Sequence, residues 1–117
     1  MKKSFLLIIE KAAGTPFEVF VQHEIFSKLG MSKTTFNPHE DSSCFAATAY
    51  DERAKQYKRG VVHDENALSM GGISGHAGLF STAEDLHKFA LMIEQDGMTP
   101  NGSLIEPKLI ELSRRNF

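Results

Sequence analysis

Five polar side chains in one glycine-rich stretch are the best candidates for chemistry in this sequence. They are His63, Asp64, Asn66, Ser74 and His76. The stretch covers residues 63–78 and holds four glycines between Gly71 and Gly78. Glycine permits positive φ and close backbone approach. Such a loop can form one wall of a binding site, or it can simply connect a hairpin to a helix, and the residue types leave both interpretations open.

The serines of the chain lack the neighbours that would activate them. A nucleophilic serine needs a base, and Ser-x-x-Lys is the spacing by which a helix places a lysine beside the hydroxyl. None of the serines has a lysine three residues later. The segment around Ser74 also lacks the Gly-x-Ser-x-Gly pattern of a nucleophile elbow, because position 76 is histidine. We therefore expect no catalytic residue in this chain.

Neither a metal site nor a phosphate loop is expected. The histidines form no His-Glu-x-x-His or His-x-His pattern; they are His23, His39, His63, His76 and His87. Adjacent side chains such as those of His63 and Asp64 rarely converge on one ion, so His63 is expected to face solvent. Residues 71–75 lack the lysine that a phosphate loop needs. No metal and no cofactor are expected.

Composition and charge are those of an ordinary globular protein. Hydrophobic residues make up 41% and charged residues 24% of the 117 positions. The net charge is −2, and Lys55, Lys58 and Arg59 are too few to form a basic stripe, so no nucleic-acid partner is expected. The single cysteine, Cys44, excludes an internal disulfide and is interpreted as a small apolar residue.

The N-terminal sequence imitates a signal peptide but is interpreted as a helix. Two lysines precede an apolar run at residues 5–9, and Glu10 ends this run before it reaches the roughly seven residues that an h-region needs. No stretch approaches the roughly 20 apolar residues of a membrane span. We expect no membrane span, and the sequence does not indicate a compartment.

Start and stop signals predict two helices in the first 30 residues. The first covers residues 4–13 and ends at Gly14. Thr15 caps the second, with Pro16 at its first position and Glu18 completing a capping box. An apolar stripe at helical spacing follows, and Gly30 ends the helix. The stripe consists of Phe17, Phe20, Val21, Ile25 and Leu29.

The remaining elements are a hairpin, an irregular loop and two further helices. Residues 45–50 and 57–62 are expected to pair across residues 51–56, and residues 63–78 are expected to be irregular. Ser81 or Thr82 caps a helix that ends near Gly97, and a last helix begins at Pro107. The apolar residues of these two helices are Leu86, Phe89, Ala90, Ile93, Leu109, Ile110 and Leu112.

Two segments resemble one family of enzymes. Residues 20–36, FVQHEIFSKLGMSKTTF, resemble a helix that runs into a "PLGM-x-x-T-x-F" turn, although Ser27-Lys28 stands where proline is common. Residues 60–67 and 71–86 resemble "GxVHDxNA … GGxxGHAGLFSTAxDL". Both patterns are typical of serine β-lactamase-related hydrolases, the group of class C β-lactamases, penicillin-binding proteins and esterases. The resemblance covers nearly the whole chain in order.

The resemblance implies acyl transfer by motifs that this chain does not contain. In the family, the serine of Ser-x-x-Lys attacks a β-lactam, D-Ala peptide or ester carbonyl, assisted by Tyr-x-Asn and a Lys/His-Thr-Gly strand. None of the three motifs occurs here. His76-Ala77-Gly78 imitates the third, but it leads into a capped helix instead of lying on a strand. The chain is therefore expected to be an internal fragment, inactive alone, whose residues 63–78 border a substrate cleft or only connect elements.

The expected fold class is mainly α with a small β-hairpin. As a relative of these hydrolases, the chain would form a partial β-lactamase/transpeptidase-like fold with an incomplete central sheet. Residues 1–117 would be a single fragment, the middle and largely helical part of the domain. Two alternatives are a standalone interaction module and one half of a split enzyme, because exposed apolar helix faces favour self-association or a complementing chain.

Overall fold

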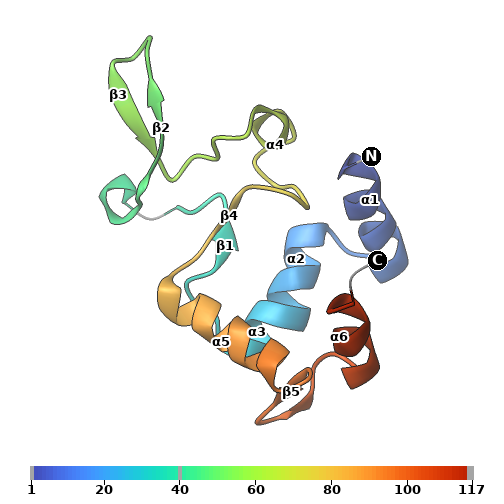
Figure 1. The fold of residues 1–117 in the computed structure, drawn as a ribbon. Helices are drawn as coiled ribbons and strands as arrows, with labels where there is room; N and C mark the ends of the chain where they lie inside the picture. The colour runs from blue at the N-terminus through green and yellow to red at the C-terminus, as the bar shows by residue number, and fades with distance from the viewer. Residues whose placement is uncertain (1, 40, 116–117) are drawn as a thin grey trace. The chain divides into compact units, whose positions relative to one another are not determined.

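The computed structural model describes residues 2–39 and 41–115, which form two compact units (Figure 1). The first unit comprises Met1–Phe20 and Thr35–Phe80, and the second comprises Val21–Thr34 and Ser81–Phe117. Each unit is assembled from segments that are distant in the sequence, so each depends on long-range contacts as well as on local signals. We describe the two units separately.

The first unit begins with the predicted helix α1, Lys2–Ala13, which ends where Gly14 takes φ +70°. Helix α2, Phe17–Val21, follows at once. The cap expected at Thr15 stays a prediction. The backbone N–H of Phe17 donates to Glu10 Oε1 at 2.8 Å, so a side chain of α1 satisfies one N–H at the start of α2.

The predicted hairpin is confirmed and is slightly shorter than expected. Strands β2, Ala47–Asp51, and β3, Gln56–Arg59, pair antiparallel (Figure 1). Tyr50 lies opposite Tyr57, and their ring centroids are 5.1 Å apart in an edge-to-face arrangement. Such cross-strand aromatic pairs stabilise two-stranded ribbons.

A second, very short pair of strands in this unit was not predicted. Strand β1, Thr35–Phe36, pairs antiparallel with β4, Leu79–Phe80. Strands of two residues are too short to show the alternation of apolar and polar residues from which strands are predicted. The ring of Phe36 also lies 5.9 Å from that of Phe17, which joins this pair to α2.

The second unit opens with a π-helical turn where a regular helix was predicted. The turn covers Gln22–Phe26 and continues into α3, Ser27–Leu29, which Gly30 ends with φ +66° as expected. A π turn places residues five apart on one side. For that reason Val21 and Phe26 are the buried residues here, and the predicted stripe with its i+4 spacing is broken after Val21.

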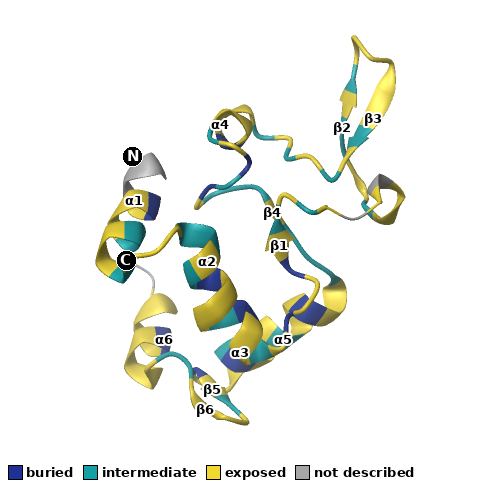
Figure 2. Ribbon diagram, turned by 180° about the vertical axis from the view of Figure 1, so that it is seen from behind, coloured by how far each residue is buried: buried dark blue, intermediate teal, exposed yellow. Residues whose placement is uncertain are grey.

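Helix α5, Ala83–Glu94, begins at the predicted cap, since Thr82 Oγ1 accepts from the N–H of Asp85 at 3.2 Å. Its apolar face is exposed, with Leu86 54% and Phe89 37% accessible, whereas Asp85 and Met92 are buried. Figure 2 shows this alternation along the helix. The buried face of α5 therefore contains the carboxylate of Asp85 as well as the apolar side chain of Met92.

The chain ends in a small hairpin and a helix. Strands β5, Met98–Thr99, and β6, Gly102–Ser103, were not predicted, whereas α6, Pro107–Ser113, begins at the predicted proline. Ile110 is its buried residue. No helix in the described part of the chain has the length and apolar character needed to cross a bilayer.

Candidate functional site

The stretch at residues 63–78, expected to be irregular, contains a short helix. This helix, α4, covers Glu65–Ser69. Asp64 caps it from an extended conformation, and its carboxylate Oδ1 accepts from the N–H of Ala67 at 2.8 Å. Aspartate is among the best N-cap residues, so Asp64 directly before a run of helix formers was a local signal for this helix.

The glycines after α4 allow two backbone segments of the first unit to touch. Gly72 and Gly78 take φ of +83° and +102°. A Cβ on Gly78 would lie 2.1 Å from the carbonyl oxygen of Gly72, and a Cβ on Gly72 would lie 2.0 Å from Asn37 Oδ1. Asn37 Nδ2 also donates to the carbonyl of Gly71 at 2.7 Å. Much of the glycine content thus has a structural cause.

Three of the five candidate residues form one chain of hydrogen bonds, which we call the Asp64 brace. His76 Nε2 lies 3.0 Å from Asp64 Oδ1, and Ser74 Oγ bonds His76 Nδ1. Since a carboxylate only accepts, Nε2 carries a proton, and in the neutral ring Nδ1 is then the acceptor for the Ser74 hydroxyl. The brace fastens the glycine loop to the start of α4.

The brace shares its residue types and its hydrogen-bond order with a catalytic triad but lacks the accessible hydroxyl that catalysis requires. A nucleophilic serine must reach a substrate carbonyl as well as donate its proton to a base. Ser74 is only 3% exposed. Asp64 also caps α4, and Ser74 is only two residues from His76, as expected for a local turn. The arrangement can position a loop, and it offers no nucleophile to a substrate.

The other two candidates lie outside the brace. His63 and Asn66 are exposed on either side of Asp64. Among the described residues, no group of three or more His, Cys, Asp or Glu could hold a metal ion, and no buried side-chain N or O lacks a partner. The structure thus brings together Asp64, Ser74 and His76 and leaves His63 and Asn66 at the surface.

The second unit contains a more deeply buried carboxylate that was not singled out from the sequence. Asp85 Oδ2 accepts from the N–H of Lys33 at 2.8 Å and from Thr34 Oγ1 at 2.9 Å. Its Oδ1 accepts from Lys88 Nζ at 3.1 Å. Ser81 Oγ lies 2.8 Å from Thr34 Oγ1. These five residues, the Asp85 network, fasten the turn after α3 to the first turns of α5.

The Asp85 network stabilises the charged forms of both Asp85 and Lys88. Burial alone would raise the pKa of Asp85, but hydrogen bonds from Thr34, Lys88 and Lys33 outweigh it and hold the pKa below its ordinary value. The hydrogen bond to Asp85 raises the pKa of Lys88, against a smaller opposing effect of burial. Lys88 Nζ also donates to the carbonyl of Gly30 at 2.7 Å. The network therefore holds an ionised pair.

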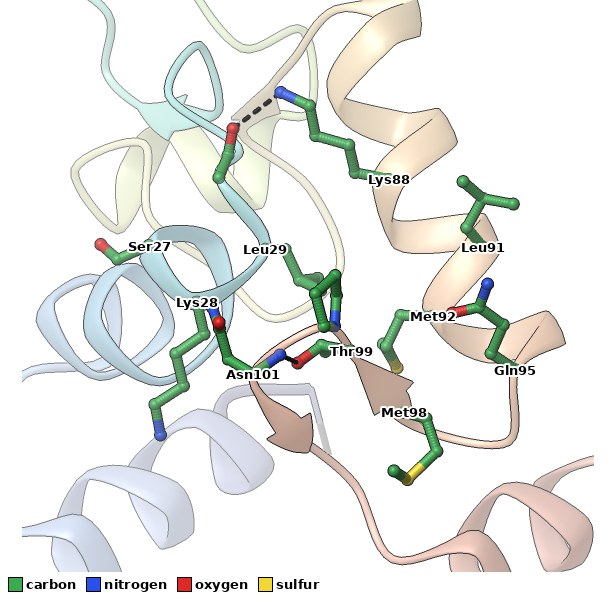
Figure 3. Close-up of a pocket in the computed structure, with 12 residues that line it drawn as sticks. Ser27, Lys28, Leu29, Lys88, Leu91, Met92, Gln95, Met98, Thr99 and Asn101 are labelled. Atoms are coloured by element: carbon green, nitrogen blue, oxygen red, sulfur yellow. Dashed lines mark hydrogen bonds between the residues drawn. The ribbon is translucent and has the colours of Figure 1, made fainter.

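A cavity of about 480 Å³ lies in the second unit, between α3, α5 and the β5–β6 turn (Figure 3). Leu91, Met92 and Met98 contribute apolar lining. Its two lysines, Lys28 and Lys88, each bond another group of the same unit. The lining therefore presents no free charge to a ligand.

Solved structures show the fold to which this arrangement belongs. The chain matches a simvastatin synthase from Aspergillus terreus with a TM-score of 0.59 and 20% identity, over 90% of this chain and 26% of that one. It matches an octameric penicillin-binding protein homologue from Pyrococcus abyssi with a TM-score of 0.58 and 25% identity, over 89% and 21%. The chain has a partial β-lactamase/transpeptidase-like fold, mainly α, with strands only in two-stranded sheets among the described residues.

The family model described as Beta-lactamase matches residues 5–115, and the chain belongs to that family. An N-acetylmuramyl-L-alanine amidase of Bacillus subtilis (strain 168) is 35% identical over 90% of this chain. A Salmonella newport (strain SL254) protein named "Putative D-alanyl-D-alanine carboxypeptidase" is 32% identical over 93%. The chain spans 27% and 29% of the lengths of these two relatives.

Proposed function

We propose that this chain is the middle, largely helical part of a serine hydrolase domain that acts through an acyl-enzyme. The substrates would be β-lactams, D-Ala peptides or esters. The observation that carries the proposal is the family match over residues 5–115, together with relatives named as an amidase and a carboxypeptidase. The chain spans under a third of those relatives, which supports its role as part of a larger domain.

The 117-residue chain is proposed to carry out no acyl transfer by itself. The sequence holds no Ser-x-x-Lys and no Tyr-x-Asn. Ser74 is the serine that is paired with a histidine and a carboxylate, and it is buried in the Asp64 brace. A hydroxyl that is only 3% exposed is not accessible to a carbonyl carbon of a substrate.

An acylation assay on the purified chain tests this proposal. The chain is incubated with a fluorescent penicillin, and separately with a p-nitrophenyl ester. We expect no covalent labelling of the chain by the fluorescent penicillin. We also expect p-nitrophenol to be released no faster than with the denatured chain. The Bacillus subtilis amidase serves as a family reference in the same assays. Stoichiometric acylation or steady turnover by the 117-residue chain would contradict the proposal.

Within the domain, residues 63–78 are proposed to form one wall of the substrate cleft. Their backbone is held by the Asp64 brace and by the contacts between Gly72, Gly78 and Asn37. His63 and Asn66 are exposed next to this fixed backbone and are the side chains available for polar contacts. A preorganised wall loses less entropy on binding than a mobile loop would.

Association through apolar helix faces is a second candidate function. On α1, Phe5 and Ile8 are 69% and 62% exposed, and on α5 the Leu86 and Phe89 side chains are also accessible. Exposed apolar patches favour association. Size-exclusion chromatography with light scattering tests this: self-association gives a mass that rises with concentration and falls in Leu86→Gln. A monomer at all concentrations would contradict it.

A further inference from the structure

Three asparagines in the described part of the chain differ in the backbone that follows them; they are Asn37, Asn66 and Asn101. An asparagine side chain loses its amide when the backbone nitrogen of the next residue attacks Cγ. The next residue must therefore carry an N–H, and its segment must be able to bend toward Cγ. A following glycine allows this bending best, because it has no Cβ. The fourth asparagine of the sequence, Asn116, lies outside the described residues.

The first two asparagines do not meet these conditions. Asn37 is followed by Pro38, which has no backbone N–H. Asn66 is followed by Ala67, which is fully buried in α4. The N–H of Ala67 donates to Asp64 Oδ1 at 2.8 Å, so this nitrogen is held by the helix cap and cannot turn toward the Asn66 side chain.

Asn101 meets both conditions, since it is followed by Gly102 at the tip of the β5–β6 hairpin. Both residues are exposed. The base of the hairpin is anchored, because the N–H of Leu104 donates to the carbonyl of Gly97 at 2.8 Å. The tip is held only by strands of two residues each and by the bond from the Asn101 N–H to Thr99 Oγ1 at 3.2 Å. Such a short hairpin opens locally at little cost.

The same unit contains a second pair of this kind, Asp96-Gly97, whose surroundings block the reaction. Gly97 is buried, and its N–H donates to the carbonyl of Met92 at 2.9 Å as part of the end of α5. The Asp96 carboxylate is bonded to Arg114 at 2.8 Å. Glycine after an acidic or amide residue is therefore not sufficient, and the structure selects Asn101-Gly102 from the two pairs.

We propose that Asn101 is a site of spontaneous deamidation. The Gly102 nitrogen forms a bond to Cγ of Asn101 and gives up its proton, while the Cγ–Nδ2 bond breaks and the amide leaves as ammonia. Water then opens the cyclic imide. Cleavage of the bond to Cγ gives aspartate, and cleavage of the bond to the main-chain carbonyl carbon of Asn101 gives isoaspartate. Water is the only co-reactant, and no atom is oxidised or reduced.

The modification changes the cavity of the second unit. Asn101 lines this cavity together with Lys28 and Lys88 (Figure 3). Both lysines are already bonded within the unit, so the unmodified lining presents no free charge. Aspartate or isoaspartate at position 101 adds one carboxylate to it. Deamidation therefore gives the cavity a negative charge that increases with the age of the protein.

Peptide mass spectrometry of the aged chain tests the proposal. The folded chain is kept for several days in a warm, mildly alkaline buffer, beside a sample unfolded in guanidinium chloride. Trypsin then releases residues 89–108, in which deamidation of Asn101 adds about 1 Da and gives both aspartate and isoaspartate. We expect folding to slow deamidation at Asn66 at least about tenfold and at Asn101 less than about threefold, because only the Ala67 nitrogen must first be released from a helix.

Asn101→Gln is the matched control, since it keeps the amide but would have to close a larger ring. The variant is expected to show no such increase in mass at position 101. An Asn101 that keeps its amide in the folded chain, or one that folding protects as strongly as Asn66, would overturn the proposal. An equal gain of mass in Asn101→Gln at position 101 would also overturn it, because attack by the Gly102 nitrogen would then not explain the loss of the amide.

Discussion

The two units each tie a turn to the start of a helix through an aspartate, but they do so in different surroundings. In the second unit, the Asp85 side chain is 2% exposed and is bonded by a backbone N–H, a hydroxyl and an ammonium group. In the first unit, the Asp64 side chain is 37% exposed and bonds a backbone N–H and a histidine. The same residue type therefore serves two purposes.

The difference lies in what replaces water around each carboxylate. A buried charge is tolerated only where hydrogen bonds and an opposite charge compensate for lost hydration. Every partner of Asp85 is a donor, so a neutral substitute would leave donors without an acceptor. The Asp64 side chain is 37% exposed, so solvent can compensate for part of what a substitution removes. We conclude that the Asp85 network stabilises its unit, whereas the Asp64 brace fixes a local conformation.

The strongest way to break this comparison is the pair Asp85→Asn and Asp64→Asn. An amide at position 85 places an NH₂ group against either Lys88 or the donors of Lys33 and Thr34. An amide at position 64 can still accept from the N–H of Ala67, because asparagine caps helices as well as aspartate. Urea unfolding should show a large drop in midpoint for Asp85→Asn and a small one for Asp64→Asn. Equal drops would contradict the comparison.

Acid unfolding sharpens the same point. The folded pKa of Asp85 lies below its ordinary 3.8, so the stability contributed by Asp85 is complete above 3.8 and is lost as the pH falls through the folded value. Glu24, Asp41 and Asp51 also have lowered pKa values. The readout is therefore the difference in unfolding free energy between the chain and Asp85→Asn, which should narrow below pH 3.8. A difference independent of pH would count against an ionised Asp85.

Removing one hydroxyl should lower the unfolding free energy more in the Asp85 network than in the Asp64 brace. Thr34→Val removes one of the three hydrogen bonds to Asp85 and the bond between Thr34 and Ser81, and it is expected to cost about 1–3 kcal/mol of unfolding free energy. Ser74→Ala removes a donor whose acceptor, His76, is partly accessible to water, and is expected to cost about 1 kcal/mol. Denaturant titrations at neutral pH measure both. A larger loss of unfolding free energy in Ser74→Ala than in Thr34→Val would contradict the comparison, because the Asp64 brace would then stabilise the chain more than the Asp85 network does.

The smallest effect is expected at the exposed members of the candidate site. His63→Ala and Asn66→Ala should each change the unfolding free energy by less than about 0.5 kcal/mol, as is usual for surface positions. The same denaturant titrations measure it. A loss as large as that of Ser74→Ala would place these side chains in the framework of the loop, and their proposed place on a cleft wall would lose its basis.

The elements with local signals were predicted well. Gly14, Thr82 and Pro107 are signals that act within a single helical turn. The structure ends a helix before Gly14 and begins helices after Thr82 and at Pro107. The hairpin at residues 47–59 was also found. By contrast, the β1–β4 pair and the π turn at Gln22–Phe26 depend on contacts that short sequence windows do not contain.

The site was predicted in part. Asp64, Ser74 and His76 were selected as candidates, but the hydrogen bonds that turn them into a brace depend on the folded loop. The Asp85 network was missed because Thr34 and Asp85 are 51 residues apart. One signal was available: Thr34 and Asp85 are the threonine and aspartate of the two segments that resemble the hydrolase family. The border of a substrate cleft at residues 63–78 stays a prediction.

Our central claim is that the Ser74–His76–Asp64 arrangement is a brace and not a catalytic triad. The most direct measurement is the intact mass of the chain after incubation with a small fluorophosphonate, which labels activated serines. We expect an unchanged mass, because the Ser74 hydroxyl is buried and the reagent cannot reach it. A single phosphonyl adduct on the chain that is lost in Ser74→Ala would contradict it.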